Sequence, residues 1–357
     1  MARVAFIGLG NMGGGMAANL AAKGAEVVAF DLAAPALERA RGNGCLIATS
    51  AEEAVAGADV VVTMLPAGKH VASVYRDSIL GKAPTSALLI DCSTIDVATA
   101  KSVEAEAAVK NAEAVVTMLP AGKHVAEVYR ATVLPNAPKS AILIDCSTID
   151  VATAKAVEGE AQAAGFNMVD APVSGGIAAA EGGTLTFMVG GSDEGFERAR
   201  PYLEQMGKAV IHAGAAGAGQ AAKICNNMLL GATMAATCEA FVLAQKLGLD
   251  PQTFYDISSK ASGQSWSMTS YCPVPGVGPE TPADRDYEGG FAAALMLKDL
   301  KLAMEAARES GAYTPMGGEA EELYQRFVDR GGAGKDFSGL IKMIDDSWQV
   351  PGESDGA

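Results

Sequence analysis

Histidine and cysteine, which build most metal sites and disulfide frameworks, are few in this sequence. The 357 residues include three histidines and six cysteines, and no two cysteines form a CxxC pair. Scattered thiols without that spacing argue against a zinc site and against a disulfide scaffold. Because free cysteine is usually a core residue, we expect reduced, buried thiols and no metal. The six cysteines are Cys45, Cys92, Cys146, Cys225, Cys238 and Cys272.

Positive charge is scarce as well. The chain has 27 Lys and Arg against 42 Asp and Glu, a formal net charge of −15 at pH 7. This balance argues against nucleic acid or an anionic membrane as the main partner, since both repel an acidic surface. A small anionic substrate is still possible, because a local lysine and backbone amides can override the net charge. Only 6% of the residues are aromatic and 49% are hydrophobic, which is typical of a compact α/β protein.

No long apolar run is free of polar residues. The longest, 218–247, contains Lys223, Asn226, Asn227 and Glu239, so we interpret it as a buried helix rather than a membrane span. The chain opens on Met1-Ala2-Arg3 and enters a predicted strand without a charged leader and apolar stretch. We therefore expect a soluble, cytoplasmic protein.

What the sequence does contain is a repeated segment. Residues 51–104 recur as residues 105–158, with 40 identities in 54 aligned positions. Two copies are too few for a solenoid, which needs about three or more stacked repeats. We interpret the repeat as a tandem duplication inside a fold that needs one copy. Its 14 differences favour a drifted duplication, or two alternative exons joined together, over a cloning repeat.

Outside the repeat, short apolar runs alternate with helical stretches to about residue 170. Residues 4–7 and 27–31 are typical of buried parallel strands, and the alternation predicts βαβ units. From Gly219 the pattern becomes helical, beginning with a helix that ends at Gly248. We predict an α/β Rossmann-type domain with a parallel sheet over residues 1–217, a long helix leading into an all-α domain over 218–348, and a flexible tail over 349–357. Further helices are expected over residues 251–260, 291–310 and 319–330.

A glycine-rich turn, Gly8-Leu9-Gly10-Asn11-Met12-Gly13, follows the first strand, and Asp31 ends the second. Glycines in this context allow a tight turn, close approach of a pyrophosphate and close helix–strand packing. The helix N-terminus offers free N–H groups to the phosphates. Asp31 can accept hydrogen bonds from ribose hydroxyls and would repel a 2′-phosphate. Since no arginine follows it, the sequence predicts NAD rather than NADP.

Lys223 and Asn227 are spaced i, i+4 and therefore share one face of the long helix. A lysine buried near a bound hydroxyl can act as a general acid or base, with its pKa lowered by desolvation. A place on the exposed stripe of an amphipathic helix is an equal alternative from this segment.

Two further segments are weaker signals. Ser174 stands beside Gly175 and Gly176, where a hydroxyl and consecutive backbone N–H groups make a nest suited to a carboxylate, although such a segment is more often a plain turn. Lys298 adjoins Asp299 on a predicted helix, and such a pair is usually a solvated surface feature.

Five motifs occur in one order along the chain: IGLGNMG at 7–13, DCST at 91–94, DAPVSGG at 170–176, GQAAKICNN at 219–227 and LKDL at 297–300. In this order they resemble the β-hydroxyacid dehydrogenase family, most closely its 3-hydroxyisobutyrate dehydrogenase branch. Segments 183–191 and 335–338 strengthen that resemblance, and Asn11 and Thr186-Phe187 fit this branch better than the tartronate semialdehyde or glyoxylate reductase branches. It covers residues 3 to about 345, interrupted only by the extra copy.

The resemblance implies NAD-dependent oxidation of (S)-3-hydroxyisobutyrate to methylmalonate semialdehyde, as in valine breakdown, by a homodimer or homotetramer. Lys223 would be the catalytic acid/base, Asn227 would place the substrate, and Ser174, Gly175 and Gly176 would hold its carboxylate. Lys298 would lie near both nicotinamide and substrate. Other cofactor-binding residues would be Leu119, Pro120 and Thr148, or their copy-one equivalents Leu65, Pro66 and Thr94.

Two other functions stay open: a sister dehydrogenase acting on L-serine, 3-hydroxypropionate or tartronate semialdehyde, and a folded but inactive NAD-binding protein. If both copies joined one sheet, two extra strands at about 4.8 Å each would move the Ser174 loop roughly 10 Å from the cofactor. Hydride transfer requires reacting atoms within about 3.5 Å. An active enzyme must therefore use one copy natively. We favour residues 105–158, because the strand carrying Ser174 must follow its partner through a short crossover.

Overall fold

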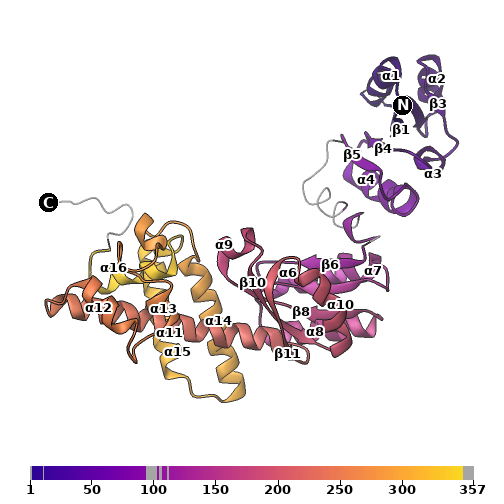
Figure 1. Cartoon of the computed structure of the whole chain (residues 1–357). Coiled ribbons are helices and arrows are strands. Elements are labelled where there is room, and N and C mark those ends of the chain that lie inside the picture. Colours follow the sequence, from indigo (N-terminus) through magenta and orange to yellow (C-terminus); the bar gives the residue numbers. More distant parts are fainter. Residues whose placement is uncertain (1, 11, 94–102, 104–106, 111, 349–357) are drawn as a thin grey trace. The chain divides into compact units, whose positions relative to one another are not determined.

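The computed structural model describes residues 2–10, 12–93, 103, 107–110 and 112–348. The chain divides into two compact units. One comprises Met1–Val115 with Glu127–Ala141, and the other Val116–Ala126 with Ile142–Ala357. Figure 1 shows the elements in sequence colours, with two separate β-sheets. The glycine-rich turn belongs to the first unit, and the long helix belongs to the second.

The first unit holds a parallel sheet in the order β3-β2-β1-β4-β5. Val4 to Ile7 are buried along β1, because helices cover both faces of a parallel sheet. The predicted strands and parallel pairing are confirmed. The elements are β1 (Arg3–Ile7), α1 (Gly13–Ala22), β2 (Glu26–Phe30), α2 (Ala34–Gly42), β3 (Leu46–Ile47), α3 (Ala51–Val55), β4 (Val60–Thr63), α4 (Gly68–Val74), a π-helical turn over Tyr75–Ile79, and β5 (Leu88–Asp91).

The second sheet has the order β11-β10-β8-β7-β6, with β9 paired to β10. Strands β7 and β8 run parallel, whereas β10 runs antiparallel to both β8 and β9, a reversal that the sequence pattern did not reveal. The reversal arises because the chain turns back between β9 and β10. The elements are β6 (Ala114–Thr117), α6 (Gly122–Val128), a π-helical turn over Tyr129–Val133, α7 (Leu134–Asn136), β7 (Ile142–Asp145), α8 (Val151–Ala163), β8 (Asn167–Asp170), β9 (Val173–Ser174), α9 (Gly176–Glu181), β10 (Leu185–Gly191), α10 (Asp193–Leu203) and β11 (Gly207–Gly214).

A helical bundle follows, organised around the 29-residue helix α11 (Ala218–Lys246). Its core includes Met234, Phe241, Leu300 and Tyr324. Within the described part of the chain, α11 is the one helix long and apolar enough to cross a membrane, but half of its most apolar window is buried. It is therefore the core helix predicted from its polar residues. The other elements are α12 (Pro251–Ser258), α13 (Trp266–Thr269), α14 (Ala293–Ser310), α15 (Pro315–Phe327), α16 (Leu340–Ile344), a kinked turn over Val328–Gly332 in which Gly331 has a positive φ, and 3-10 turns over Pro282–Arg285 and Phe337–Gly339.

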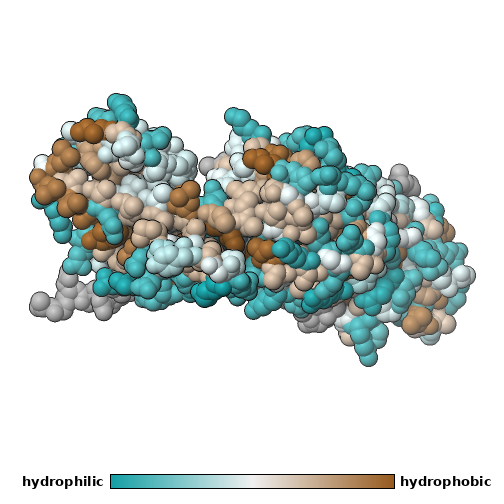
Figure 2. Space-filling view, turned by 90° about the horizontal axis from the view of Figure 1, so that it is seen from below, coloured by the Kyte–Doolittle hydropathy of each residue, from teal (hydrophilic) through white to brown (hydrophobic). Residues whose placement is uncertain are grey.

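Apolar side chains also reach the surface of this helical part. Figure 2 shows brown, strongly apolar residues gathered at the left of the view, where the C-terminal helices lie. Large exposed side chains on α11 and α12 include Leu229, Leu243 and Ile257. Contiguous exposed apolar surface is typical of a protein-contact face.

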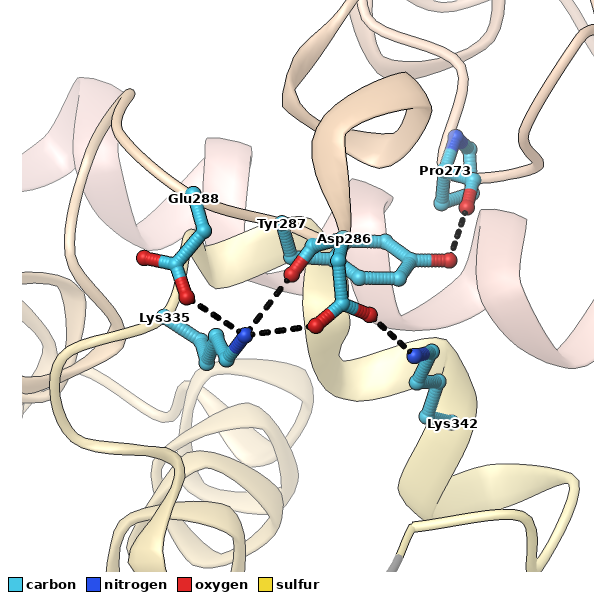
Figure 3. Close-up of polar contacts among 6 residues, drawn as sticks. All are labelled: Pro273, Asp286, Tyr287, Glu288, Lys335 and Lys342. Atoms are coloured by element: carbon cyan, nitrogen blue, oxygen red, sulfur yellow. Dashed lines mark hydrogen bonds and ion pairs between the residues drawn. The ribbon is translucent and has the colours of Figure 1, made fainter.

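A cluster of ion pairs supports the strained turn after the 3-10 helix (Figure 3). Asp286 and Tyr287 both have left-handed backbone angles, with φ of 51° and 59°. Lys335 donates to the Asp286 carbonyl and carboxylate and to Glu288, while Lys342 donates to the other Asp286 oxygen. The Lys335 and Lys342 ammonium groups lower the pKa of Asp286 to about 2. These contacts fasten residues 335–342 to the turn.

The cysteine prediction is correct in part. All six thiols are free, and Cys45, Cys146, Cys238 and Cys272 are buried. Cys225, however, is exposed, because it lies on the opposite face of α11 from Lys223 and Asn227. Among the residues that the structure describes, no group of three or more His, Cys, Asp or Glu side chains could hold a metal ion.

Where both copies of the repeat are described, they share two strands, a short helix and a π-helical turn, although only copy two continues into α7, and they have different neighbours. β4 lies between β1 and β5 in one sheet, whereas its copy β6 is the edge strand of the other. Val62 of β4 is 6% exposed and its equivalent Val116 is 46% exposed. The contrast reverses at the next strand, where Ile90 of β5 is 38% exposed and Ile144 of β7 is fully buried. Each copy thus lacks a neighbour that the other has.

Candidate active site

The glycine-rich turn after β1 is built as its sequence predicts. Gly8 has φ of 96°, and a Cβ there would overlap the Met64 carbonyl; a Cβ on Gly13 would overlap the Gly8 carbonyl. A Cβ on Gly10 would meet open space, so the turn presents free backbone at this point. No acidic residue and no side-chain cap occupy the first turn of α1. The Gly14 N–H already donates to the Gly10 carbonyl at 3.2 Å, so an anion would meet the other N–H groups of this uncapped turn.

The side chains of the turn differ in their exposure to solvent. Leu9 is buried in the core beneath the sheet, and Met12 is 65% exposed. Asn11 lies outside the described residues. The groups that could meet a dinucleotide in this turn are therefore mainly backbone.

Asp31 closes the same loop from the end of β2. One carboxylate oxygen accepts from the Leu9 N–H at 2.6 Å and the other accepts from the Ala33 N–H at 2.7 Å. A carboxylate has about four acceptor positions, so Asp31 keeps capacity for ribose hydroxyls. Leu32, next in the chain, is almost fully exposed.

Each copy of the repeat builds an identical loop where its two strands end. Thr63 Oγ1 donates to Asp91 Oδ1 at 2.7 Å, and the Leu65 N–H donates to Ser93 Oγ at 2.7 Å. In the second copy Thr117 donates to Asp145 at 2.8 Å, and the Leu119 N–H donates to Ser147 Oγ at 2.8 Å. The loops before Pro66 and Pro120 are therefore held alike. Thr94 lies outside the described residues.

Helix α11 is anchored to the second sheet at its N-terminus by Asp170. The carboxylate, 2% exposed, accepts from the Gly217 N–H at 2.8 Å and from the Gln220 N–H at 2.7 Å. A Cβ on Gly190 or on Gly219 would overlap this carboxylate, so both glycines permit the close approach. Burial raises the pKa of Asp170 despite these hydrogen bonds. The anchor fixes where the first turns of α11 lie.

Those first turns carry Lys223 and Asn227, which the structure buries on one face. Lys223 is 7% exposed and Asn227 is 1% exposed. Asn227 Nδ2 donates to Asp299 Oδ2 of α14 at 2.6 Å. Burial lowers the pKa of Lys223, the nearby Asp299 carboxylate raises it, and Lys298 lowers it. The buried interpretation of the Lys223 face is thus confirmed, and the lysine has an environment that favours its neutral form.

Helix α14 joins this face to the second copy of the repeat. Lys298 Nζ donates to the Thr148 carbonyl at 2.8 Å and lies 3.3 Å from Asp299 Oδ1. Gln220 of α11 bonds the same segment, accepting from the Ile149 N–H at 3.0 Å and donating to the Ser147 carbonyl at 2.7 Å. Residues 147–149 of copy two are therefore tied to both helices.

Ser174 ends β9, in register with Thr186 of β10. Gly175 and Gly176 follow with φ of 134° and 70°, a conformation that side-chain-bearing residues rarely adopt. The Ser174 side chain is half-buried and both glycines are exposed. Their backbone groups are thus open to a ligand.

Comparison with known proteins agrees with these motifs. Residues 3–112 and again 103–214 match the NAD binding domain of 6-phosphogluconate dehydrogenase. Residues 217–344 match the NAD-binding region of NADP-dependent 3-hydroxyisobutyrate dehydrogenase. A 3-hydroxyisobutyrate dehydrogenase of Pseudomonas aeruginosa is 42% identical over 347 residues, which cover 96% of this chain and 98% of the relative.

The chain belongs to the 3-hydroxyisobutyrate dehydrogenase family. A solved structure of the Mycobacterium tuberculosis 3-hydroxyisobutyrate dehydrogenase with L-serine has 41% identity and a TM-score of 0.58, covering 96% of this chain and 99% of that one. An NAD-dependent L-serine dehydrogenase of P. aeruginosa is 40% identical over 345 residues, covering 97% and 98%. This member of the family is an NAD(P)-dependent 3-hydroxyacid dehydrogenase, an oxidoreductase that acts on a CH–OH group.

Sequence reasoning missed three polar residues that position this dehydrogenase's lysine face. Asp170, Gln220 and Asp299 lie inside the DAPVSGG, GQAAKICNN and LKDL motifs, and the sequence pattern assigned none of them a role. All three are at most 2% exposed. The usable signal was a charged or amide side chain inside an apolar pattern, since such a group is buried only when it is paired. The partners themselves lie 47 to 73 residues away in the chain, so spacing could not have identified them.

Proposed function

We propose that this dehydrogenase oxidises (S)-3-hydroxyisobutyrate to methylmalonate semialdehyde with NAD⁺, and that Lys223 is its general base. The main support is the buried lysine face of α11. Lys223, Asn227 and Asp299 are buried together, and a buried lysine ammonium is easier to deprotonate than one in water. A lysine kept on the surface would not have this property.

In the proposed reaction the chain's own groups bind and orient the substrate. The Ser174 hydroxyl and the Gly175 and Gly176 N–H groups hold its carboxylate, as a backbone nest does for an anion. Asn227, fixed by its hydrogen bond to Asp299, places the reacting hydroxyl. Neutral Lys223 Nζ accepts the hydroxyl proton while the carbinol carbon loses its hydride and becomes a carbonyl. Bound NAD⁺ supplies the hydride acceptor, at C4 of the nicotinamide.

The cofactor preference rests on Asp31. The residues around the turn fit a dinucleotide: an N-terminus of α1 without a side-chain cap or an acidic residue, open space at Gly10, and an acidic strand end. A 2′-phosphate beside the Asp31 carboxylate would meet like charge, and Leu32-Ala33-Ala34 provides no arginine to offset it. NAD is therefore the proposed cofactor, although the family model that matches residues 217–344 is described as NADP-dependent.

Comparison of kcat/KM over a substrate panel tests the reaction. The panel is (S)-3-hydroxyisobutyrate, L-serine, 3-hydroxypropionate and tartronate semialdehyde, each with NAD⁺ or NADH in the appropriate direction. We expect the highest value for 3-hydroxyisobutyrate. Highest activity with L-serine would replace the proposed substrate by a second candidate, which the L-serine dehydrogenase relative and the L-serine complex favour. NADH binding without turnover on any member would refute the proposal.

We also propose that the enzyme is a homodimer or homotetramer. The exposed apolar side chains of α11 and α12 support this (Figure 2), because such surface is usually covered by a partner. Leu243, 59% exposed on α11, is a suitable probe. Light scattering after size-exclusion chromatography should give a multimer for the wild type and a smaller species for Leu243→Glu. A wild-type monomer would refute the assembly.

A further inference from the structure

The two sheets do not divide the strands of one sheet between them. Each sheet contains its own copy of the two strands of the repeat. A common doubly wound order is 3-2-1-4-5-6. The first sheet contains β3-β2-β1-β4-β5, which matches this order up to its fifth strand. The second begins β6-β7-β8, in which β6 and β7 are the repeat's copies of β4 and β5. Strand β8 thus occupies the sixth place next to copy two.

The free edge of β6 is equivalent to the edge of β4 on which β1 pairs. The Met64 N–H donates to the Ile7 carbonyl, so this side of β4 faces β1. In copy two the Thr117 carbonyl accepts from the Cys146 N–H, as the Thr63 carbonyl does from Cys92. Since strand N–H groups alternate sides, the amides of Val116 and Met118 lie on the side away from β7.

We propose that β1, followed by β2 and β3, exchanges from β4 to β6, and that the catalytically competent sheet is the one in which β1 pairs with β6. The expected register is Ala5 with Val115 and Phe6 with Val116, by analogy with Ala5–Val61 and Phe6–Val62. Copy one is then expelled from the sheet. The inference rests on the proposed function, because hydride transfer requires the Gly8–Gly13 turn and Lys223 to serve one substrate.

The two pairings are close to equal for β1. Within the four paired positions only Val60 differs, as Ala114, and the loop that follows is held by the same bonds in both copies. The exchange would cover Val116, which is 46% exposed, and Met118, which is 67% exposed.

Copy two is favoured in the competent sheet by its contacts to the substrate residues. Gln220 and Lys298 bond residues 147–149, so copy two is already fastened to the helices that carry Lys223 and Asp299. In the opposite exchange, β8 would move from β7 to β5, and the bonds from Gln220 and Lys298 to residues 147–149 would have to break. Moving β1 with β2 and β3 breaks the pairing with β4 and the packing of β1 and β2 against α3, which are both contacts to copy one.

Matched proline variants in the two copies test the exchange. Val116→Pro removes an N–H on the free edge of β6, which an edge strand tolerates. It should leave the fold and melting temperature of the second unit unchanged, yet lower kcat/KM about 100-fold or more by blocking β1. Val62→Pro, at the identical place in β4, should keep kcat/KM within about threefold of wild type. A fall in kcat/KM in Val62→Pro only, in both variants, or in neither variant would overturn the proposal.

Hydrogen exchange gives a readout that does not depend on turnover. In wild-type enzyme with NADH, the amides of Val116 and Met118, which face away from β7, should be protected, and Val116→Pro should remove the protection of Met118. Rapid exchange there in the wild type overturns the proposal. Protection together with no turnover on any substrate would instead refute the proposed function. Protection that appears only at protein concentrations giving new multimers would mean that β1 comes from a second chain, and would overturn the intrachain form.

Discussion

The charge of Asp299 should set the pH range in which Lys223 works. Lys223 and Asp299 are both buried, and the carboxylate raises the lysine pKa against the larger lowering by burial. Asp299→Asn removes this opposite charge but keeps the shape, and the amide oxygen can still accept from Asn227. The loss of a nearby opposite charge shifts a buried pKa by about 1 to 3 units. The Lys298 ammonium, which the substitution leaves in place, also lowers the pKa of Lys223.

The sign of the effect follows from which form of Lys223 is active. Oxidation needs neutral Lys223, so its rate rises as pH increases through the lysine pKa. Asp299→Asn should move this rising limb of the pH profile to lower pH by about one unit or more. On the acidic limb the variant should then be about tenfold faster relative to its own plateau. Reduction needs protonated Lys223, so its falling limb should move to lower pH as well.

Full pH profiles of kcat/KM in both directions provide the assay. Lys223→Ala is the companion variant: it should lose about 10² to 10⁴ in kcat, the usual contribution of general acid–base catalysis, while NADH fluorescence titration stays normal. Asp286→Asn, in the distant ion cluster, should leave the profile in place. An unmoved limb in correctly folded Asp299→Asn, or near-normal turnover of Lys223→Ala, would refute the acid/base role.

Three other predictions follow from single contacts. Asp31→Asn keeps acceptors for the Leu9 loop but removes the charge, so the ratio of kcat/KM for NAD⁺ to that for NADP⁺ should fall about tenfold; an unchanged ratio would count against its ribose role. Gly190→Ala should lower the free energy of unfolding by about 1–3 kcal/mol in denaturant titrations, because its Cβ overlaps the Asp170 anchor, whereas Gly159→Ala on the exposed face of α8 should raise it by about 0.5–1 kcal/mol. Equal effects of the two changes would contradict the anchor. Since the pKa of Asp286 is lowered to about 2, its ion pairs stabilise the fold above about pH 4 and are lost as pH falls through 2. Asp286 is largely exposed, so Asp286→Asn should cost at most about 1 kcal/mol at pH 6, and the difference from wild type should vanish near pH 2.

Local patterns were reliable guides to individual elements. The strands over residues 4–7 and 27–31 and the long helix from Gly219 to Gly248 all appear within a residue or two of their expected bounds. The later helices shift more: the segment expected over 319–330 is a helix from Pro315 to Phe327. Proline at the first helical position explains the earlier start, since its fixed φ suits that place and its missing N–H is not needed there.

The site could be predicted as a set of residues but not as an arrangement. The glycine spacing pointed to the turn after β1 because the backbone itself needs those glycines. From the sequence alone, a buried and an exposed Lys223 were equally favoured. In the structure Lys223 interacts with the Asp299 carboxylate, which lies 76 positions further along the chain. Such pairings depend on how α11 and α14 pack, and a period of 3.6 residues carries no information about a second helix.

The repeat separates what sequence determines from what tertiary structure decides. Sequence determines the local form of both copies: each has the same Thr–Asp–Ser loop, the same short helix and a π-helical turn at the same place. Tertiary structure alone decides that Val62 is buried and Val116 half exposed, or that Ile144 is buried and Ile90 is not. The physical reason is that hydrogen bonds within a loop or helix form among near neighbours, whereas the burial of a strand depends on which other strands pair beside it. Two nearly identical segments therefore share local elements where both are described and occupy different places.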